Sequence, residues 1–284
     1  NRPAPPRPRS LELFTGGILL FLLLSGALWS FASAAGQTLL LPILLAGCAL
    51  LTVLLTLLCA LPTRWMLAGM AALLAALLLL VWRLFPWLRL GEITYRCAVV
   101  NTVCTSLELD GFIRPIAQLP DAVWVRCATL LTLVASGALG TPLALAVVRR
   151  PSLPAAFLLT GPFVLAPLCI SVTPDWMPLM GLLLGWIALG LGALVRRWDR
   201  AGAARLTLLS LPAAALLLAL LGLAMPQDSY QRPRWADDAL DAINTWVSRL
   251  DPSLAHGKGL FGLGSGGSFT DADGRIALAD AGPL

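Results

Sequence analysis

Hydrophobic residues are concentrated in seven stretches of about twenty residues each, built almost entirely from Leu, Ala, Val, Ile and Gly and separated by polar connections. A helix rises about 1.5 Å per residue, so about 20 apolar residues cross a hydrocarbon layer roughly 30 Å thick. No acid or base lies in the middle of any stretch. The pattern predicts an all-α membrane protein, a polytopic bundle of about seven transmembrane helices (13–225). The expected spans are 13–34, 38–61, 65–82, 125–148, 153–170, 176–195 and 206–225.

Tryptophan positions and composition support this prediction. Trp65, Trp82, Trp87, Trp124 and Trp176 lie near the ends of predicted spans, where the amphipathic indole ring suits the boundary between lipid and water. The chain is 58% hydrophobic and only 12% charged, which leaves too little polar surface to cover a soluble body of this size. The composition therefore argues against a soluble helical bundle.

The connection between the third and fourth predicted spans, 83–120, is too long and too apolar for an ordinary loop. Ile93, Val99 and Val103 belong to a partly helical apolar face, which Glu92 and Arg96 interrupt. This pattern is typical of an element that lies in the membrane interface or docks on the bundle.

The carboxy-terminal region 226–284 has a different composition from the spans. In 235–250, apolar residues recur at spacings of three, four and seven, and three aspartates occupy the first turns. This arrangement predicts an amphipathic helix whose acids face the positive end of the helix dipole. A glycine-rich stretch and a short β pattern without a partner strand follow. We therefore expect an extracellular stalk helix and the truncated start of a further domain.

The charges in the connections predict the orientation of the chain, because cytoplasmic loops carry an excess of Lys and Arg. One set of connections is strongly basic and holds only two acids, Glu12 and Asp199. In the other set, which includes 83–121, acids match or outnumber bases. We expect 1–12 to be a cytoplasmic basic tail and, after seven crossings, the carboxyl terminus to lie outside. The basic set comprises Arg2, Arg7, Arg9, Arg64, Arg149, Arg150, Arg196, Arg197, Arg200 and Arg205.

The net charge of +5 follows from this topology. The bases sit in pairs beside apolar spans and do not form one continuous basic face, so no nucleic-acid partner is predicted. The expected partner is the lipid bilayer.

The sequence contains few side chains that could act as a nucleophile or a metal ligand. The cysteines in or beside apolar spans are interpreted as small hydrophobes. If 83–120 is helical, the spacing of Cys97 and Cys104 separates their backbones by about 10 Å, beyond disulfide reach. The single histidine, His256, is far from every cysteine, so neither a metal site nor a cofactor is predicted. The cysteines within spans are Cys48, Cys59, Cys127 and Cys169.

Two motif-like strings near the carboxyl end are interpreted as turns. The glycines of 262–267 lack the Lys and the following Ser or Thr of a phosphate-binding loop. Asp271, Asp273 and Gly274 resemble part of a calcium loop, but the bidentate Glu is missing.

The spans also lack the features of a transport route. Ion and proton pathways need buried ionisable groups or broken helices lined by polar backbone, and such a group costs about 2.5 to 3.5 kcal/mol on insertion scales. None occupies a span centre. The glycines at 181, 185, 190 and 192 allow close approach of helix backbones, which we interpret as packing within the bundle in preference to a dimer face.

Several short motifs from Val134 onward occur in an informative order. They are ValValArgArg ending at Arg150, SerValThrProAspTrp at 171–176, ArgArg at 196–197, the exit ProGlnAspSerTyrGlnArgProArgTrp at 226–235, and the GlyGly and ThrAsp of 264–273. This order resembles the membrane-embedded amino-terminal region of bacterial, especially Gram-positive, membrane-anchored transglutaminase-like proteins. The resemblance implies a following extracellular β-rich segment, a papain-like domain with a Cys, His and Asp triad, and commonly a last membrane helix. No cysteine of this chain matches that nucleophile.

The leading hypothesis is a multi-pass anchor that holds an extracellular transglutaminase- or protease-like domain at the outer face of a bacterial cell membrane. The resemblance implies chemistry on amide bonds of an extracellular protein or peptidoglycan. No catalytic, cofactor-binding or metal-binding residue is assigned within the chain, and its status as an enzyme stays open. One alternative is a polytopic permease or an envelope lipid- or polysaccharide-processing protein, and another is a purely structural subunit. The first alternative would place an active groove around Glu92, Arg96, Asp110, Arg114 and Asp121.

Overall fold

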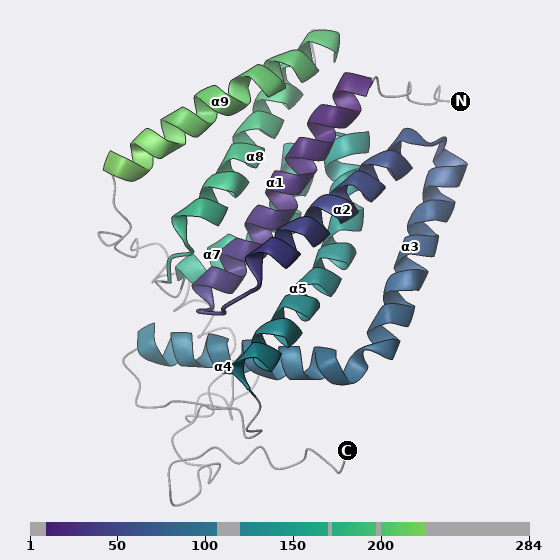
Figure 1. Ribbon diagram of the computed structural model, residues 1–284. Coiled ribbons are helices and arrows are strands. Elements are labelled where there is room, and N and C mark those ends of the chain that lie inside the picture. The colour runs from purple at the N-terminus through teal and green to yellow at the C-terminus, as the bar shows by residue number, and fades with distance from the viewer. Residues whose placement is uncertain (1–9, 107–119, 170–171, 197–199, 225–284) are drawn as a thin grey trace, which may run out of the picture.

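The computed structural model describes residues 10–106, 120–169, 172–196 and 200–224, and the regular structure in these ranges is helical (Figure 1). Leu and Ala, which favour helix, dominate the long elements. In chain order the elements are α1 (Ser10–Ala34), α2 (Leu41–Ala60), α3 (Thr63–Arg83), α4 (Phe85–Ser106), α5 (Asp121–Ala144), a π-helix η1 (Leu145–Arg149), α6 (Leu153–Thr160), α7 (Pro162–Cys169), α8 (Trp176–Val195) and α9 (Arg200–Ala224).

The predicted helical membrane bundle is confirmed. Within the described ranges, six helices are long and apolar enough to cross a membrane, judged by length and composition. They correspond to six of the expected spans, with ends that differ by a few residues. These six are Ser10–Ala34, Leu41–Ala60, Thr63–Arg83, Asp121–Arg149, Trp176–Val195 and Gly202–Leu220.

The expected span 153–170 is not one long helix. Ser152 begins α6 by accepting a hydrogen bond on its side chain from the N–H of Ala155, and α6 ends at Thr160. Pro162 has no N–H to continue the ladder, and its ring crowds the preceding turn. The chain therefore restarts at Pro162 as α7, and each half is only eight residues long.

Helix α1 forms the centre of the bundle and packs against α2, α5, α7, α8 and α9. Glycines allow its closest approach to α8. A Cβ atom at Gly26 would lie 2.8 Å from the backbone nitrogen of Leu182, and one at Gly185 would lie 2.8 Å from a methyl group of Leu23. The predicted packing role within the bundle is confirmed for Gly185, whereas a Cβ atom at Gly181 would meet nothing within 4 Å.

Helix α8 and helix α9 form an antiparallel pair. Gly192 contacts Thr207 near the α8–α9 connection, and Gly222 faces the ring of Trp176 at the opposite end. The end of α9 therefore lies beside the beginning of α8.

Helix α5 continues at its carboxyl end as the π-helix η1. Pro142 lies inside the helix and removes one backbone donor. Three residues later the chain widens into η1, with the N–H of Arg150 bonded to the carbonyl of Leu145. A proline followed by a π-turn is a recognised cause of a local bend.

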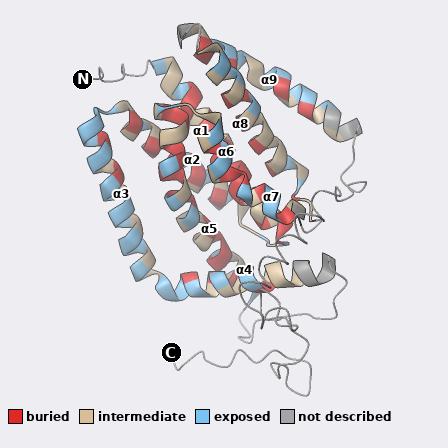
Figure 2. Cartoon of the chain, turned by 180° about the vertical axis from the view of Figure 1, so that it is seen from behind, coloured by how far each residue is buried: buried red, intermediate tan, exposed pale blue. Residues whose placement is uncertain are grey.

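Two helices lie at the periphery. Helix α3 stands at one side of the bundle and is mostly exposed (Figures 1 and 2), with only Met66 and Met70 buried. Helix α4 runs across the end of the bundle, at a steep angle to α3 and α5 (Figure 1). This agrees with the expectation of an interfacial or docked element in 83–120, of which residues 107–119 lie outside the described ranges.

Candidate functional site

The end of the bundle that carries α4, called here the α4 end, holds Glu92, Arg96 and Asp121, the described members of the expected groove. Glu92 and Arg96 form an ion pair with each other at 2.5 Å, one turn apart on α4, and their side chains are 51% and 76% exposed. An exposed pair of this kind contributes little to stability. Asp121 starts α5, while Asp110 and Arg114 lie outside the described residues. Among the described members of this set, Glu92 and Arg96 contact each other, and the convergence of all five groups stays a prediction.

Helix α4 is fixed to the bundle by close packing and a hydroxyl pair. A Cβ atom at Gly91 would lie 2.5 Å from the carbonyl oxygen of Cys127, so only glycine lets α4 cross α5 at this distance. The hydroxyls of Tyr95 and Thr132 are 2.7 Å apart. Thr132 already donates to the carbonyl of Ala128, so Tyr95 is the donor in the pair.

The α1–α2 connection joins three elements at the α4 end. Thr102 on α4 donates to the carbonyl of Ala35 at 3.1 Å. The N–H of Leu40 donates to the hydroxyl of Thr129 on α5 at 3.0 Å, and the N–H of Asp175 before α8 donates to Ser33 at 3.0 Å. These side-chain bonds were not foreseen from the sequence, because hydroxyl spacing alone does not show which helices meet.

The opposite end, called here the arginine end, contains the beginnings of α1 and α9, the end of α8 and the α2–α3 turn (Figure 1). Arg149 contacts the α2–α3 turn, donating to the carbonyl of Cys59 at 3.4 Å and to the hydroxyl of Thr63 at 3.1 Å. Arg64 and Arg150 are exposed here. The structure thus gathers bases that are far apart in the sequence.

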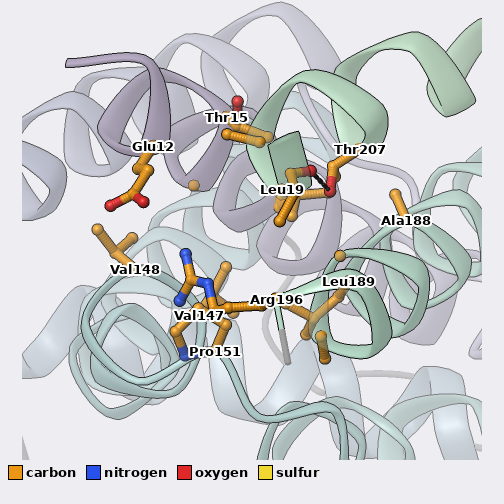
Figure 3. Close-up of a pocket in the computed structure, with 15 residues that line it drawn as sticks. Glu12, Thr15, Leu19, Val147, Val148, Pro151, Ala188, Leu189, Arg196 and Thr207 are labelled. Carbon is orange, nitrogen blue, oxygen red and sulfur yellow. Dashed lines mark hydrogen bonds between the residues drawn. The ribbon is translucent and has the colours of Figure 1, made fainter. Parts of the chain in front are cut away.

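A small cavity opens at the arginine end among α1, η1, α8 and α9. Glu12 and Arg196 face it from different helices, beside Val148 and Thr207 (Figure 3). Its volume of about 30 Å³ is enough for water and too small for a metabolite. Thr207 donates to the carbonyl of Ala203 in its own helix. We therefore interpret this cavity as a hydration site between helices.

Polar groups inside the long helices mostly bond to their own backbone. Thr15, Thr56 and Thr141 each donate to the carbonyl four residues earlier, at 2.7–3.0 Å. Among the residues that can be described, the buried hydroxyls without a hydrogen-bond partner are Ser30 and Thr52. The buried polar residues of this part of the chain are all Ser or Thr. Asp, Glu, Lys, Arg and His are therefore absent from the buried residues of the described ranges.

An apolar groove lies between the first half of α1 and the second half of α2. Its volume is about 380 Å³, and Phe14, Gly17, Phe21 and Val53 are among its lining residues. Ligand sites normally place a few polar groups to orient the ligand, and this lining offers only two threonine side chains. The groove suits the acyl chains of a bilayer better than a polar substrate.

The cysteines of the described ranges lie within helices. Cys48, Cys59, Cys97 and Cys127 are free and buried, and no cluster of three or more potential metal-binding side chains occurs there. Burial raises the pKa of the Cys97 thiol, which keeps it protonated near neutral pH. Since α4 continues to Ser106, Cys104 lies two turns away from Cys97, as expected for a helical segment.

The other expected elements lie outside the described residues. They include the amphipathic helix 235–250, the glycine-rich string 262–267, the three residues that resemble a calcium loop, and His256. Comparison of the chain with known protein families, curated proteins and solved structures yields no match.

Proposed function

We propose that this chain is the multi-pass anchor region of a bacterial membrane protein and holds an extracellular transglutaminase- or protease-like domain at the outer face. The observation that carries the proposal is the kind of polar side chain buried inside the membrane-spanning helices. In the described part of the chain, the buried polar groups of the long helices are hydroxyls bonded mainly to their own backbone. Such an interior supports helix packing and offers no route for ions or protons.

The distribution of charge supports an orientation with the amino terminus in the cytoplasm. At the arginine end, Arg149 bonds to Thr63, the neighbour of Arg64, and exposed Arg150 follows it in the chain. Arg196 and Glu12 line a cavity at the same end. Among the described residues at the α4 end, the three acids Glu92, Asp121 and Asp175 accompany four arginines, Arg83, Arg89, Arg96 and Arg126. By the positive-inside rule, the arginine end faces the cytoplasm and the α4 end faces outward.

The path of the chain supports an outward exit. Gly222, near the end of α9, lies against Trp176 at the start of α8, and Asp175 is bonded to Ser33 at the α4 end. The described end of α9 therefore lies beside the beginning of α8, on the side of the bundle where α1 ends. Hydrogen bonds among α1, α4, α5 and the start of α8 stiffen the surface from which a following domain would project.

The chemical part of the proposal rests on the resemblance in 134–273. It predicts that the reading frame beyond Leu284 encodes a domain with Cys, His and Asp, which acts on amide bonds of an extracellular protein or of peptidoglycan. Reading the coding sequence past Leu284 tests this part directly. A continuation without a globular domain that contains these three residues would disprove it.

The anchoring part is tested by replacing 13–225 with an unrelated single-span anchor of the same outward orientation. We expect amide-bond hydrolysis or cross-linking at the cell surface to persist, because the bundle supplies attachment and no chemistry. An anchor of reversed orientation is the control and should abolish surface activity. Loss of activity from a domain that is folded and displayed outside would show that the bundle has a role of its own.

A further inference from the structure

The junction of α3 and α4 is a tight, hydrogen-bonded corner. Leu84 is the only residue between the two helices. Its N–H donates to the carbonyl of Leu80, and its own carbonyl accepts from the N–H of Leu88. At this corner the chain turns from running along the bundle to running across its end (Figure 1). Backbone hydrogen bonds therefore continue through the turn.

The surface of this corner is rich in exposed aromatic rings. Trp82 is 79% exposed, Phe85 58% and Trp87 52%, and the corner is coloured as exposed in Figure 2. Exposed clusters of large apolar side chains mark interaction surfaces. Tryptophan in particular favours the layer between hydrocarbon and water. We call Trp82, Arg83, Phe85, Trp87 and Arg89 the aromatic corner.

Two arginines accompany the rings. Arg83 and Arg89 are both exposed. Within the described ranges neither guanidinium forms an ion pair, whereas Arg96, further along α4, is paired with Glu92. A guanidinium matches a phosphate group well because it donates two parallel hydrogen bonds.

The length of α3 places the corner at the membrane boundary. Trp65, near the other end of α3, is 70% exposed and lies about 26 Å from Trp82 along the helix, at about 1.5 Å per residue. This distance is close to the roughly 30 Å thickness of a hydrocarbon core. Between the two rings, α3 exposes Leu74, Leu78 and Leu79. The helix therefore has an apolar middle and an aromatic ring at each boundary.

We propose that the aromatic corner binds phospholipid headgroups of the leaflet at the α4 end and thereby holds α4 in the plane of the membrane surface. The rings of Trp82, Phe85 and Trp87 occupy the layer between acyl chains and headgroups, and Arg83 and Arg89 bind phosphate. The match between the length of α3 and the bilayer favours lipid over a protein partner. This binding depends neither on the direction in which the chain crosses the membrane nor on the proposed anchoring function.

Depth measurement tests the placement. Single cysteines at positions 85 and 87, in a variant whose native cysteines are replaced, are labelled with a small fluorophore. The full chain is reconstituted into phosphatidylglycerol and phosphatidylethanolamine vesicles brominated near either the glycerol or the methyl end of the acyl chains. We expect stronger quenching by bromine near the glycerol end at 85 and 87, and the reverse at Leu78→Cys in the middle of α3.

Two results would overturn the placement. Labels at 85 and 87 that neither bromine position quenches, and that water-soluble quenchers also fail to reach, would indicate contact with protein such as a second copy. Labels that water-soluble quenchers reach freely would place the corner in water. The label at Leu78→Cys shows in either case that the vesicles contain correctly inserted protein.

Lipid retention tests the role of the arginines. The Arg83→Gln, Arg89→Gln double variant should retain less phosphatidylglycerol through detergent purification than the native chain, measured by mass spectrometry of the intact complex. Arg96→Gln is the matched control, because its guanidinium is paired with Glu92, and its lipid retention should be unchanged. Equal retention by the double variant and the control would disprove phosphate binding at the corner.

Discussion

At the residue scale, the hydroxyl groups of Tyr95 and Thr102 attach α4 to the bundle by hydrogen bonds. Tyr95 stacks on Phe31 of α1 with ring centroids 6.3 Å apart and donates to Thr132 of α5. Burial raises the pKa of the Tyr95 phenol above its ordinary value. The phenol therefore stays protonated, and the hydrogen bond persists, throughout the neutral range.

Removing this hydroxyl should weaken the attachment of α4. We expect Tyr95→Phe to lower the free energy of unfolding by about 1 kcal/mol, the usual net value of one hydrogen bond. Thr132→Val also removes a bond within α5. Thermal unfolding in detergent of both single variants and the double variant gives the coupling between them. Strictly additive effects would show that the two hydroxyls do not interact.

The thiol of Cys97 provides a second test at this scale. Burial raises its pKa, so the folded state holds its proton to higher pH than the unfolded state does. The thiol then contributes no pH dependence below its ordinary pKa, and stability falls as pH rises through and beyond that value. At neutral pH we expect Cys97 to react with a water-soluble maleimide more slowly than a cysteine placed at exposed Arg96. Equal rates would show that Cys97 is accessible.

At the element scale, close helix contacts depend on particular glycines. We expect Gly26→Ala to destabilise the α1–α8 contact by about 1–3 kcal/mol, because its Cβ would meet the backbone of Leu182 and crowded interiors adapt poorly. Gly181→Ala is the matched control, since nothing lies within 4 Å of that position. The melting temperature of each purified variant measures the difference. Equal destabilisation by the two variants would contradict the packing described for Gly26.

The α2–α3 turn depends on an arginine from another part of the chain. Arg149 donates to the Cys59 carbonyl and to Thr63, so Arg149→Gln should destabilise this turn by about 1–2 kcal/mol. Arg150→Gln removes the neighbouring exposed charge and should have little effect on stability. Hydrogen exchange of the backbone amides around Thr63 reports on the turn locally. Equal protection in both variants would show that Arg149 does not hold it.

The sequence predicted the long helices because hydrophobic length is a property of each segment alone. It did not predict the break of 153–170, because proline is tolerated inside many membrane helices and the effect of Pro162 depends on neighbouring contacts. Likewise the spacing of Gly181 and Gly185 did not show that only Gly185 faces α1. The partners of Tyr95 and Arg149 lie 37 and 90 residues away, and a single sequence contains no record of such distant contacts.

At the scale of the whole molecule, the fold sorts charge between two ends. Bases that are scattered over the sequence meet at the arginine end, and this gathering follows from antiparallel packing of long helices joined by short turns. The α4 end holds both acidic and basic side chains. By the positive-inside rule, this asymmetry predicts a preferred direction of insertion, which is independent of any attached domain.

Cysteine accessibility in intact cells measures that direction. In a variant without native cysteines, we expect Arg96→Cys at the α4 end, outside the aromatic corner, to react with a membrane-impermeant maleimide, because Arg96 is exposed and the positive-inside rule places this end outside. Arg64→Cys at the arginine end is the matched control, an exposed arginine on the neighbouring helix, and it should react only after the membrane is permeabilised. Reaction of Arg64→Cys alone in intact cells would reverse the orientation. It would also place the end of α9 on the cytoplasmic side and so contradict the proposal of an anchor for a surface domain.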